Sequence, residues 1–167
     1  MSLLAIRRFP DPILKRPTRC VQRFDTQLKR LIDAMIQTMH SHPRCVGLAA
    51  PQVGSAWRIA VMDSSRHPKT TTTSGLITLI NPVIDEQKDQ TVQREGCLSI
   101  PDFTANVRRA TRVHNKAINQ SGTPFEIGLS GLEAIIAQHE IDHLDGKLFL
   151  DSVENVKTDV FRRKTYL

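Results

Sequence analysis

The sequence predicts an α+β fold in which short antiparallel strands pack around a C-terminal helix, with one amphipathic N-terminal helix. Three observations support this fold class. Two segments, one near each end, have apolar residues at helical spacing. The middle of the chain contains short β-like runs bounded by Gly, Pro, Asn and Asp. Strand–helix–strand alternation is missing, which argues against a doubly wound parallel sheet.

The first helix is predicted to begin after Asp25 and to end before Pro43. Its apolar residues fall on one face of a 3.6-residue period: Leu28, Leu31, Ile32, Met35, Ile36 and Met39. Such a stripe indicates a helix that covers a core on one side and meets solvent on the other.

Four short strands are predicted in the middle of the chain, at 58–62, 76–80, 111–115 and 124–127. The threonine run within 69–74 interrupts them and is predicted to be an exposed loop.

The second helix has the strongest boundary signals. Ser130 and Glu133 match a capping box at its start, and Gly146 is suited to a left-handed residue at its end. The residues expected on its inward face are Leu132, Ile135, Ile136, His139 and His143. Because the two histidines share a stripe with core aliphatics, they are predicted to point inward.

Composition indicates a soluble domain spanning 1–167, with a short basic tail from about residue 152. No secretory signal or membrane-spanning segment is recognised, so a cytoplasmic location without membrane association is expected. The net charge of +6 comes from scattered basic residues, including Arg108, Arg109 and Arg112, without an aromatic-interleaved motif. We therefore expect solvated surface charge and no DNA partner.

A His-Glu-x-x-His motif lies within the second helix, at residues 139–143. Residues four apart stack on one helical face, so His139 and His143 can reach one metal ion. Glu140 then lies beside the ion, where it can accept a proton from bound water. The motif predicts a hydrolytic metal site.

The third ligand decides the class of enzyme. One protease pattern would continue to a histidine at the position of Phe149, which cannot bind a metal. A second pattern would use a glutamate on a later helix, and Glu154 follows Gly146 too closely for that arrangement. Cleavage of internal peptide bonds by a zinc peptidase nevertheless remains the main rival hypothesis, and a non-catalytic metal or RNA-binding module is a second.

Cys97 is the remaining candidate ligand, since a thiolate there would complete a Cys-His-His set with one open position. An isolated cysteine is more often a buried, inert residue, which is the expectation for Cys20 and Cys45. The odd cysteine count argues against a disulfide framework. His40 and His42 form an alternative pair, expected to be solvated.

Three segments together resemble one family, the peptide deformylases (polypeptide deformylases). They are Gly47-Leu48-Ala49-Ala50-Pro51-Gln52, Glu95-Gly96-Cys97-Leu98-Ser99 and Gln138-His139-Glu140-Ile141-Asp142-His143. The resemblance extends from the Asp11-Pro12 region to about Asp151. It implies a hydrolase of protein biosynthesis that removes the formyl group from the N-terminal formyl-methionine of new polypeptides.

The resemblance also implies roles for individual residues. A metal-bound hydroxide attacks the formyl carbon, with Glu140 as general acid/base, and Gln52 and the Leu98 N–H stabilise the oxyanion. The implied metal ligands are Cys97, His139 and His143. Ferrous iron is the implied ion, with zinc, nickel and cobalt also compatible with these ligands. Glu95 and Asp142 are candidate partners of the ligand histidines.

The implied substrates are N-formylmethionyl nascent peptides. The methionine side chain would enter an apolar pocket formed by Val46, Leu132, Ile135 and Ile136. The peptide would run as an added strand near Val46, Gly47 and Gly96. Cys45 and Thr104 depart from the family pattern, which has Gly and, in many bacterial members, a basic residue there. The basic tail ending at 162–167 suggests a ribosome contact.

Overall fold

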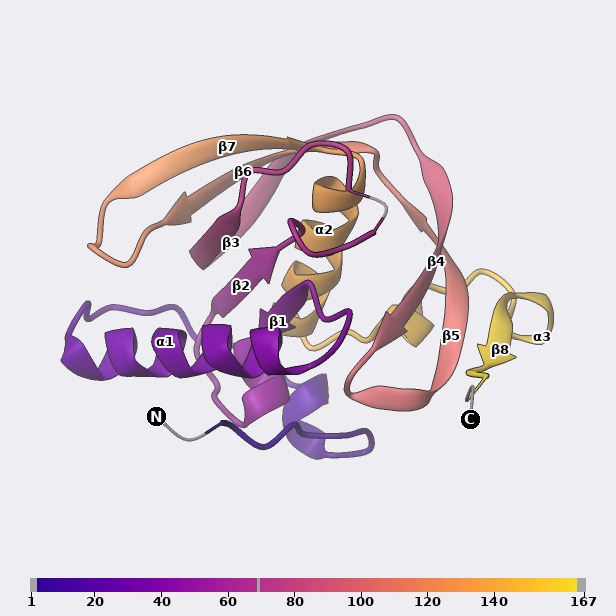
Figure 1. Cartoon of the computed structure of the whole chain (residues 1–167), viewed down its shortest axis with the longest axis horizontal. Helices are drawn as coiled ribbons and strands as arrows, with labels where there is room; N and C mark the ends of the chain where they lie inside the picture. The colour runs from indigo at the N-terminus through magenta and orange to yellow at the C-terminus, as the bar shows by residue number, and fades with distance from the viewer. Residues whose placement is uncertain (1–2, 69, 165–167) are drawn as a thin grey trace.

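The computed structural model describes residues 3–68 and 70–164, which form two antiparallel sheets (Figure 1). The larger sheet has the order β1-β2-β3-β6-β7 and the smaller one the order β4-β5-β8. The strands of the larger sheet are β1 (Gly47–Ala49), β2 (Ile59–Asp63), β3 (Leu76–Lys88), β6 (Arg112–Ile118) and β7 (Pro124–Ser130). Those of the smaller sheet are β4 (Thr91–Cys97), β5 (Ile100–Arg109) and β8 (Val160–Arg162).

Two long helices and several single turns accompany the sheets. The α-helices are α1 (Thr26–Ser41), α2 (Leu132–Leu144) and the short α3 (Val156–Asp159). The 3₁₀ turns are η1 (Pro12–Lys15), η2 (Ala50–Val53) and η3 (Phe149–Ser152). The predicted α+β class is confirmed. In the ranges 3–68 and 70–164, no helix is both long and apolar enough to cross a membrane.

The amphipathic helix α1 forms as the sequence predicts. The Asp25 carboxylate accepts a hydrogen bond from the Leu28 N–H at 2.9 Å and caps the first turn. Ile32, Met35 and Met39 are fully buried along the inner stripe, where α1 packs against β1 and β2. Burial of each such side chain stabilises the fold by roughly 1.5–3 kcal/mol.

Helix α2 is enclosed rather than amphipathic. Figure 1 shows the larger sheet curving around one side of α2, while the β4–β5 ribbon stands on the other. Ala134, Ala137 and Leu144 are fully buried, and polar residues such as Gln138 and His143 are buried as well. Because α2 lies in the interior, each of its polar side chains needs a partner or has a function.

The predicted capping box is wrong. Ser130 ends β7, and Gly131, with φ 57°, is the N-cap of α2. The Glu133 carboxylate does not reach back to this cap. It accepts hydrogen bonds from Ser64, Thr73 and Ser74 in the loop that crosses above the helix. A buried carboxylate is stabilised by charge-assisted hydrogen bonds, and the loop supplies several donors for them.

The four predicted strands all exist, but the sheets extend well beyond them. β3 continues past Pro82 to Lys88. The strand tolerates this proline because a register shift between Ile80 and Val83 interrupts the hydrogen-bond ladder there. Strands β1, β4, β5 and β8 were not predicted. Local propensity is weak in these segments, and pairing with distant partners forms them. The described part of the threonine run, 70–74, lies in a loop, as predicted.

Gly146 ends α2 in the left-handed conformation, with φ 73°, as predicted. A Cβ there would lie 3.0 Å from the Lys15 carbonyl oxygen and 2.9 Å from the Arg16 carbonyl carbon. Gly75 has a similar φ of 74° but open space around it.

We expect Gly146→Ala to lower the free energy of unfolding more than Gly75→Ala, which should cost only about 1–2 kcal/mol of backbone strain. Urea denaturation of both variants measures the difference. Equal losses would show that contact with the 15–16 backbone is unimportant.

A buried Cys-His-His cluster in a cleft between the sheets

The three predicted metal ligands come together around α2. Cys97, the last residue of β4, lies with its sulfur 3.3 Å from Nε2 of His143. The ring centroids of His139 and His143, one helical turn apart, are separated by 5.0 Å. Cys97 contributes its sulfur, and His139 and His143 each contribute a ring nitrogen. These three atoms all lie within 4.8 Å of one another. The cluster joins the smaller sheet to the central helix.

The chemistry of this cluster fits a divalent transition metal. Burial would raise the pKa of the Cys97 thiol, but His143 and His139 outweigh burial and lower it well below its usual value. A thiolate with two imidazoles is a ligand set typical of zinc, iron, nickel and cobalt sites. Nδ1 of His143 is buried without a hydrogen-bond partner. The three residues therefore suit one divalent transition-metal ion.

A chain of charged groups holds His139 in place. Its Nδ1 lies 2.8 Å from the Glu95 carboxylate, which also accepts two hydrogen bonds from Arg109 at 2.7 and 3.0 Å. Arg109 also donates to Asp142 at 2.5 Å. Burial would raise the pKa of Glu95, but the hydrogen bonds from His139 and Arg109 lower it to about 2. Glu95 and Asp142, the candidate partners, thus join one network.

Nothing in the sequence indicates the role of Arg109. The expectation of solvated surface charge is wrong for this residue, whose side chain is only 6% exposed. Its neighbour Arg108 points the other way and pairs with Glu154 at the surface. Alternation along β5 separates the two, and only the folded sheet shows which one faces the core.

Glu140 lies beside the cluster with one carboxylate oxygen, Oε2, buried and without a partner. Burial raises the pKa of Glu140 to about 7, against the lowering effect of His139 and His143. A Cβ added to Gly47 would overlap with Oε1 of Glu140 and lie 2.8 Å from its Cδ. Gly47 is therefore needed for the space it leaves to the carboxylate, rather than for a turn.

Gln52 points its amide at the cluster. Its Oε1 accepts a hydrogen bond from the Ala49 N–H at 2.9 Å, which fixes the amide orientation. Its Nε2 lies 3.2 Å from the Cys97 sulfur and 3.3 Å from the Ser99 hydroxyl. Leu98, half-buried, occupies the turn between β4 and β5 beside Cys97.

A cleft of about 1090 Å³ opens from the cluster to the surface. Its walls include every predicted substrate-binding residue: Val46, Gly47, Gly96, Leu132, Ile135 and Ile136. The edge strands β1 and β4 flank it, and within the described residues each has a hydrogen-bonded neighbour on one side only. Thr104 and the C-terminal stretch 160–164 also line the cleft, whereas 165–167 lie outside the described residues.

The remaining cysteines and histidines differ from expectation. Cys20 is exposed, not buried. Cys45 lines the cleft and donates its thiol hydrogen to the Gly47 carbonyl, and burial raises its pKa to about 12. His40, near the end of α1, lies with its Nε2 3.1 Å from the carboxylate of Asp63, the last residue of β2. Within the described residues, the histidines found grouped as possible metal ligands are His139 and His143, and the pair His40–His42 is not among them.

The fold and the site define a class of protein: an α+β enzyme with a thiolate and two helical imidazoles at the base of a cleft. A family model described as polypeptide deformylase matches residues 3–159. A peptide deformylase of Thermodesulfovibrio yellowstonii is 42% identical over 98% of this chain and 97% of its own length. The chain belongs to the polypeptide deformylase family, whose members are enzymes that remove N-formyl groups.

Solved structures agree with this assignment. The peptide deformylase of Thermotoga maritima superposes with a TM-score of 0.84 at 39% identity, covering 93% of this chain and all of that one. A Met-Ala-Ser-bound class I type b peptide deformylase from Acinetobacter baumannii has a TM-score of 0.85 at 33% identity, covering 91% and 99%.

Substitution of Arg109 tests the network behind the cluster. Arg109→Met should lower the free energy of unfolding by roughly 3–5 kcal/mol, because it leaves Glu95 charged and buried beside His139 alone. Arg108→Met is the matched control, with little effect expected, since its pair with Glu154 is exposed. Chemical denaturation measures the free energy of unfolding of both variants. Equal losses in the two would refute the structural role of Arg109.

Proposed function

We propose that this chain is a metal-dependent deformylase that acts on the N-terminal formyl-methionine of newly made polypeptides. The observation that carries the proposal is the Cys97–His139–His143 cluster with the unpartnered Oε2 of Glu140 beside it, at the base of a cleft. The activity of the family supports the same reaction.

Cys97, His139 and His143 would hold one divalent ion, with Fe²⁺ expected and Zn²⁺, Ni²⁺ or Co²⁺ able to replace it. The chemistry that such an ion supplies is Lewis acidity, which makes water acidic enough to lose a proton near neutral pH. The Glu95 carboxylate fixes the orientation of the His139 ring, so that its other nitrogen faces Cys97 and His143.

Glu140 serves as the general acid/base. Its unpartnered oxygen can accept the proton of the attacking water, and the carboxylic acid so formed can protonate the departing amine. A buried carboxylate whose pKa is raised to about 7 is suited to both transfers. Release of formate then leaves a free N-terminus.

Gln52 and the Leu98 N–H would stabilise the negative charge that develops on the formyl oxygen. The Gln52 amide is held in advance by its bond to Ala49, so no reorganisation is needed when charge develops. Its N–H already points toward the cluster, where the reacting carbonyl would lie.

The methionine side chain would occupy the apolar wall made by Val46, Leu132, Ile135 and Ile136. The peptide would extend between the free edges of β1 and β4, near Gly47 and Gly96, and its backbone would add to them as a strand. The Met-Ala-Ser peptide in the Acinetobacter baumannii relative supports a cleft for peptides that begin with methionine.

We place the enzyme in the cytoplasm, where nascent chains are made, and treat 1–167 as one catalytic domain. A ribosome contact through the basic tail stays a prediction. Three of its described basic residues, Arg162, Arg163 and Lys164, line the cleft, whereas Lys157 does not.

A direct assay tests the proposed reaction. The enzyme, prepared without oxygen and loaded with Fe²⁺, should release formate from a formyl-Met peptide. It should leave the acetyl-Met form intact, because the acetyl carbon carries a methyl group where the formyl carbon carries only hydrogen. The free-amine form has no acyl group and should also be unchanged. Enzymatic formate detection and mass spectrometry measure both products. Cleavage of internal bonds without formate would favour the zinc-peptidase hypothesis instead.

Two variants separate catalysis from metal binding. Glu140→Gln should lower kcat by about 10²–10⁴-fold with metal content retained, since only the proton carrier is lost. Cys97→Ser should reduce metal content and change the absorption of the cobalt-loaded protein, because thiolate ligation is lost. An unchanged cobalt spectrum in Cys97→Ser would refute ligation by the sulfur, and an active Glu140→Gln would refute the role of Glu140.

A further inference from the structure

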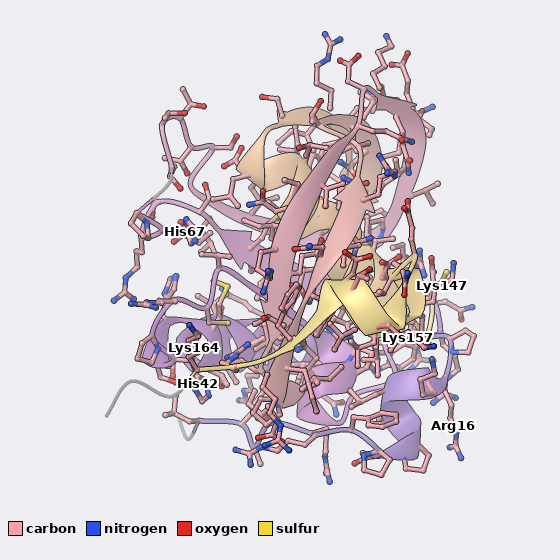
Figure 2. The ribbon with its side chains drawn as sticks, turned by 90° about the vertical axis from the view of Figure 1, so that its right-hand side faces the viewer. Arg16, His42, His67, Lys147, Lys157 and Lys164 are labelled. Atoms are coloured by element: carbon pink, nitrogen blue, oxygen red, sulfur yellow. The ribbon has the colours of Figure 1, made fainter. Side chains whose placement is uncertain are left out.

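The C-terminal stretch folds back onto the cleft. β8 pairs with β5, so that Phe161 lies opposite Thr104, and the Arg163 N–H donates to the Asp102 carbonyl at 2.8 Å. Figure 2 shows the chain after α3 crossing the molecule toward Lys164, on the side of His42 and His67. Lys157, in α3, lies on the opposite side.

The Arg163 side chain reaches across β5 to the edge strand β4. A Cβ added to Gly96 would overlap with Nη2 of Arg163 and lie 3.4 Å from its Cζ. The guanidinium therefore lies directly against the backbone of Gly96, next to Cys97, and Gly96 leaves the space for it. Both Arg163 and Gly96 line the cleft.

A second guanidinium lies on the same face of the smaller sheet. Arg94, two residues before Gly96, has its Cζ 3.5 Å from the centre of the Phe161 ring. Its Nε donates to the Asn106 side chain at 2.9 Å, and the Thr104 hydroxyl lies 3.4 Å from its Nη1. Within 3–68 and 70–164, no carboxylate forms an ion pair with Arg94 or Arg163.

This face is opposite to the one that carries the metal cluster. Alternate residues of a strand point to opposite sides, so Glu95 and Cys97 point to α2 while Arg94 and Gly96 face away from it. A peptide added along the β4 edge alternates in the same way. If its methionine points toward Ile135 and Ile136, its second residue points to the face of Arg163.

We propose that Arg163, assisted by Arg94, is a specificity-determining residue that binds an acidic side chain at the second position of the substrate. This inference rests on the proposed deformylase function. Arginine binds carboxylates through paired N–H donors, and two guanidinium groups that have no acidic partner among the described residues make a site that attracts an anion. The third residue of the peptide points back toward α2 and is not bound by this pair.

The test compares four peptides: formyl-Met-Glu-Ala-Ser, formyl-Met-Gln-Ala-Ser, formyl-Met-Ala-Glu-Ser and formyl-Met-Ala-Gln-Ser. At low salt, kcat/KM for formate release should be about tenfold higher with Glu than with Gln at the second position. The ratio should be near one at the third position. Added salt should reduce the preference, because charges at an open cleft are screened.

Variants assign the preference to Arg163. Arg163→Met should bring the second-position ratio close to one, and Arg163→Lys should retain part of it, since the charge remains. Lys157→Met is the matched control: it removes a cation from α3, just before this stretch and on the opposite side of the molecule, and should leave the ratio unchanged.

Formate release without a second-position preference would overturn this inference and leave the deformylase function standing. The inference also fails, again without harm to the deformylase function, if Arg163→Met keeps the preference. If none of the four peptides yields formate, the proposed function itself fails, and the inference with it.

Discussion

The interaction on which the site depends is the buried pairing of Glu95 with Arg109 and His139. It joins β4, β5 and α2 through charged hydrogen bonds of 2.7–3.0 Å. Removing the charges of Glu95 and Arg109 from water is costly, and their attraction, together with the hydrogen bond between His139 and Glu95, offsets this only while all three side chains remain in place. The pairing therefore sets the position of the helix that carries His139 and His143 relative to the strand that carries Cys97.

Enclosure of α2 explains why two glutamates of one site behave differently. Glu95 accepts hydrogen bonds from His139 and Arg109, and its pKa falls to about 2 despite burial, whereas burial raises the pKa of Glu140, whose Oε2 has no partner, to about 7. The first carboxylate stays ionised and orients a ring, while the second can exchange a proton. The same interior thus keeps one carboxylate ionised and gives the other a pKa near neutral, as the proposed role of Glu140 requires.

The cleft exists because the two sheets do not join. β1 ends one sheet and β4 ends the other, and the space between these edges leads to the cluster. Within the described residues β1 and β4 each have a strand neighbour on one side only, which is the arrangement that strand addition of an extended peptide requires in the proposed function. The C-terminal strand β8 adds to the far side of β5, which brings Phe161 and Arg163 to the rim without closing the β4 edge.

Features that depend on local spacing could be predicted from the amino-acid sequence alone. Helical periodicity indicated α1, the histidine spacing indicated the inward pair on α2, and the three motif segments indicated the family. The role of Arg109, the true start of α2, the burial of Glu133 under a distant loop and the approach of Arg163 to Gly96 emerged only in the folded chain. Each of these depends on contacts between residues far apart in the sequence, and the energies of such contacts outweigh local preferences.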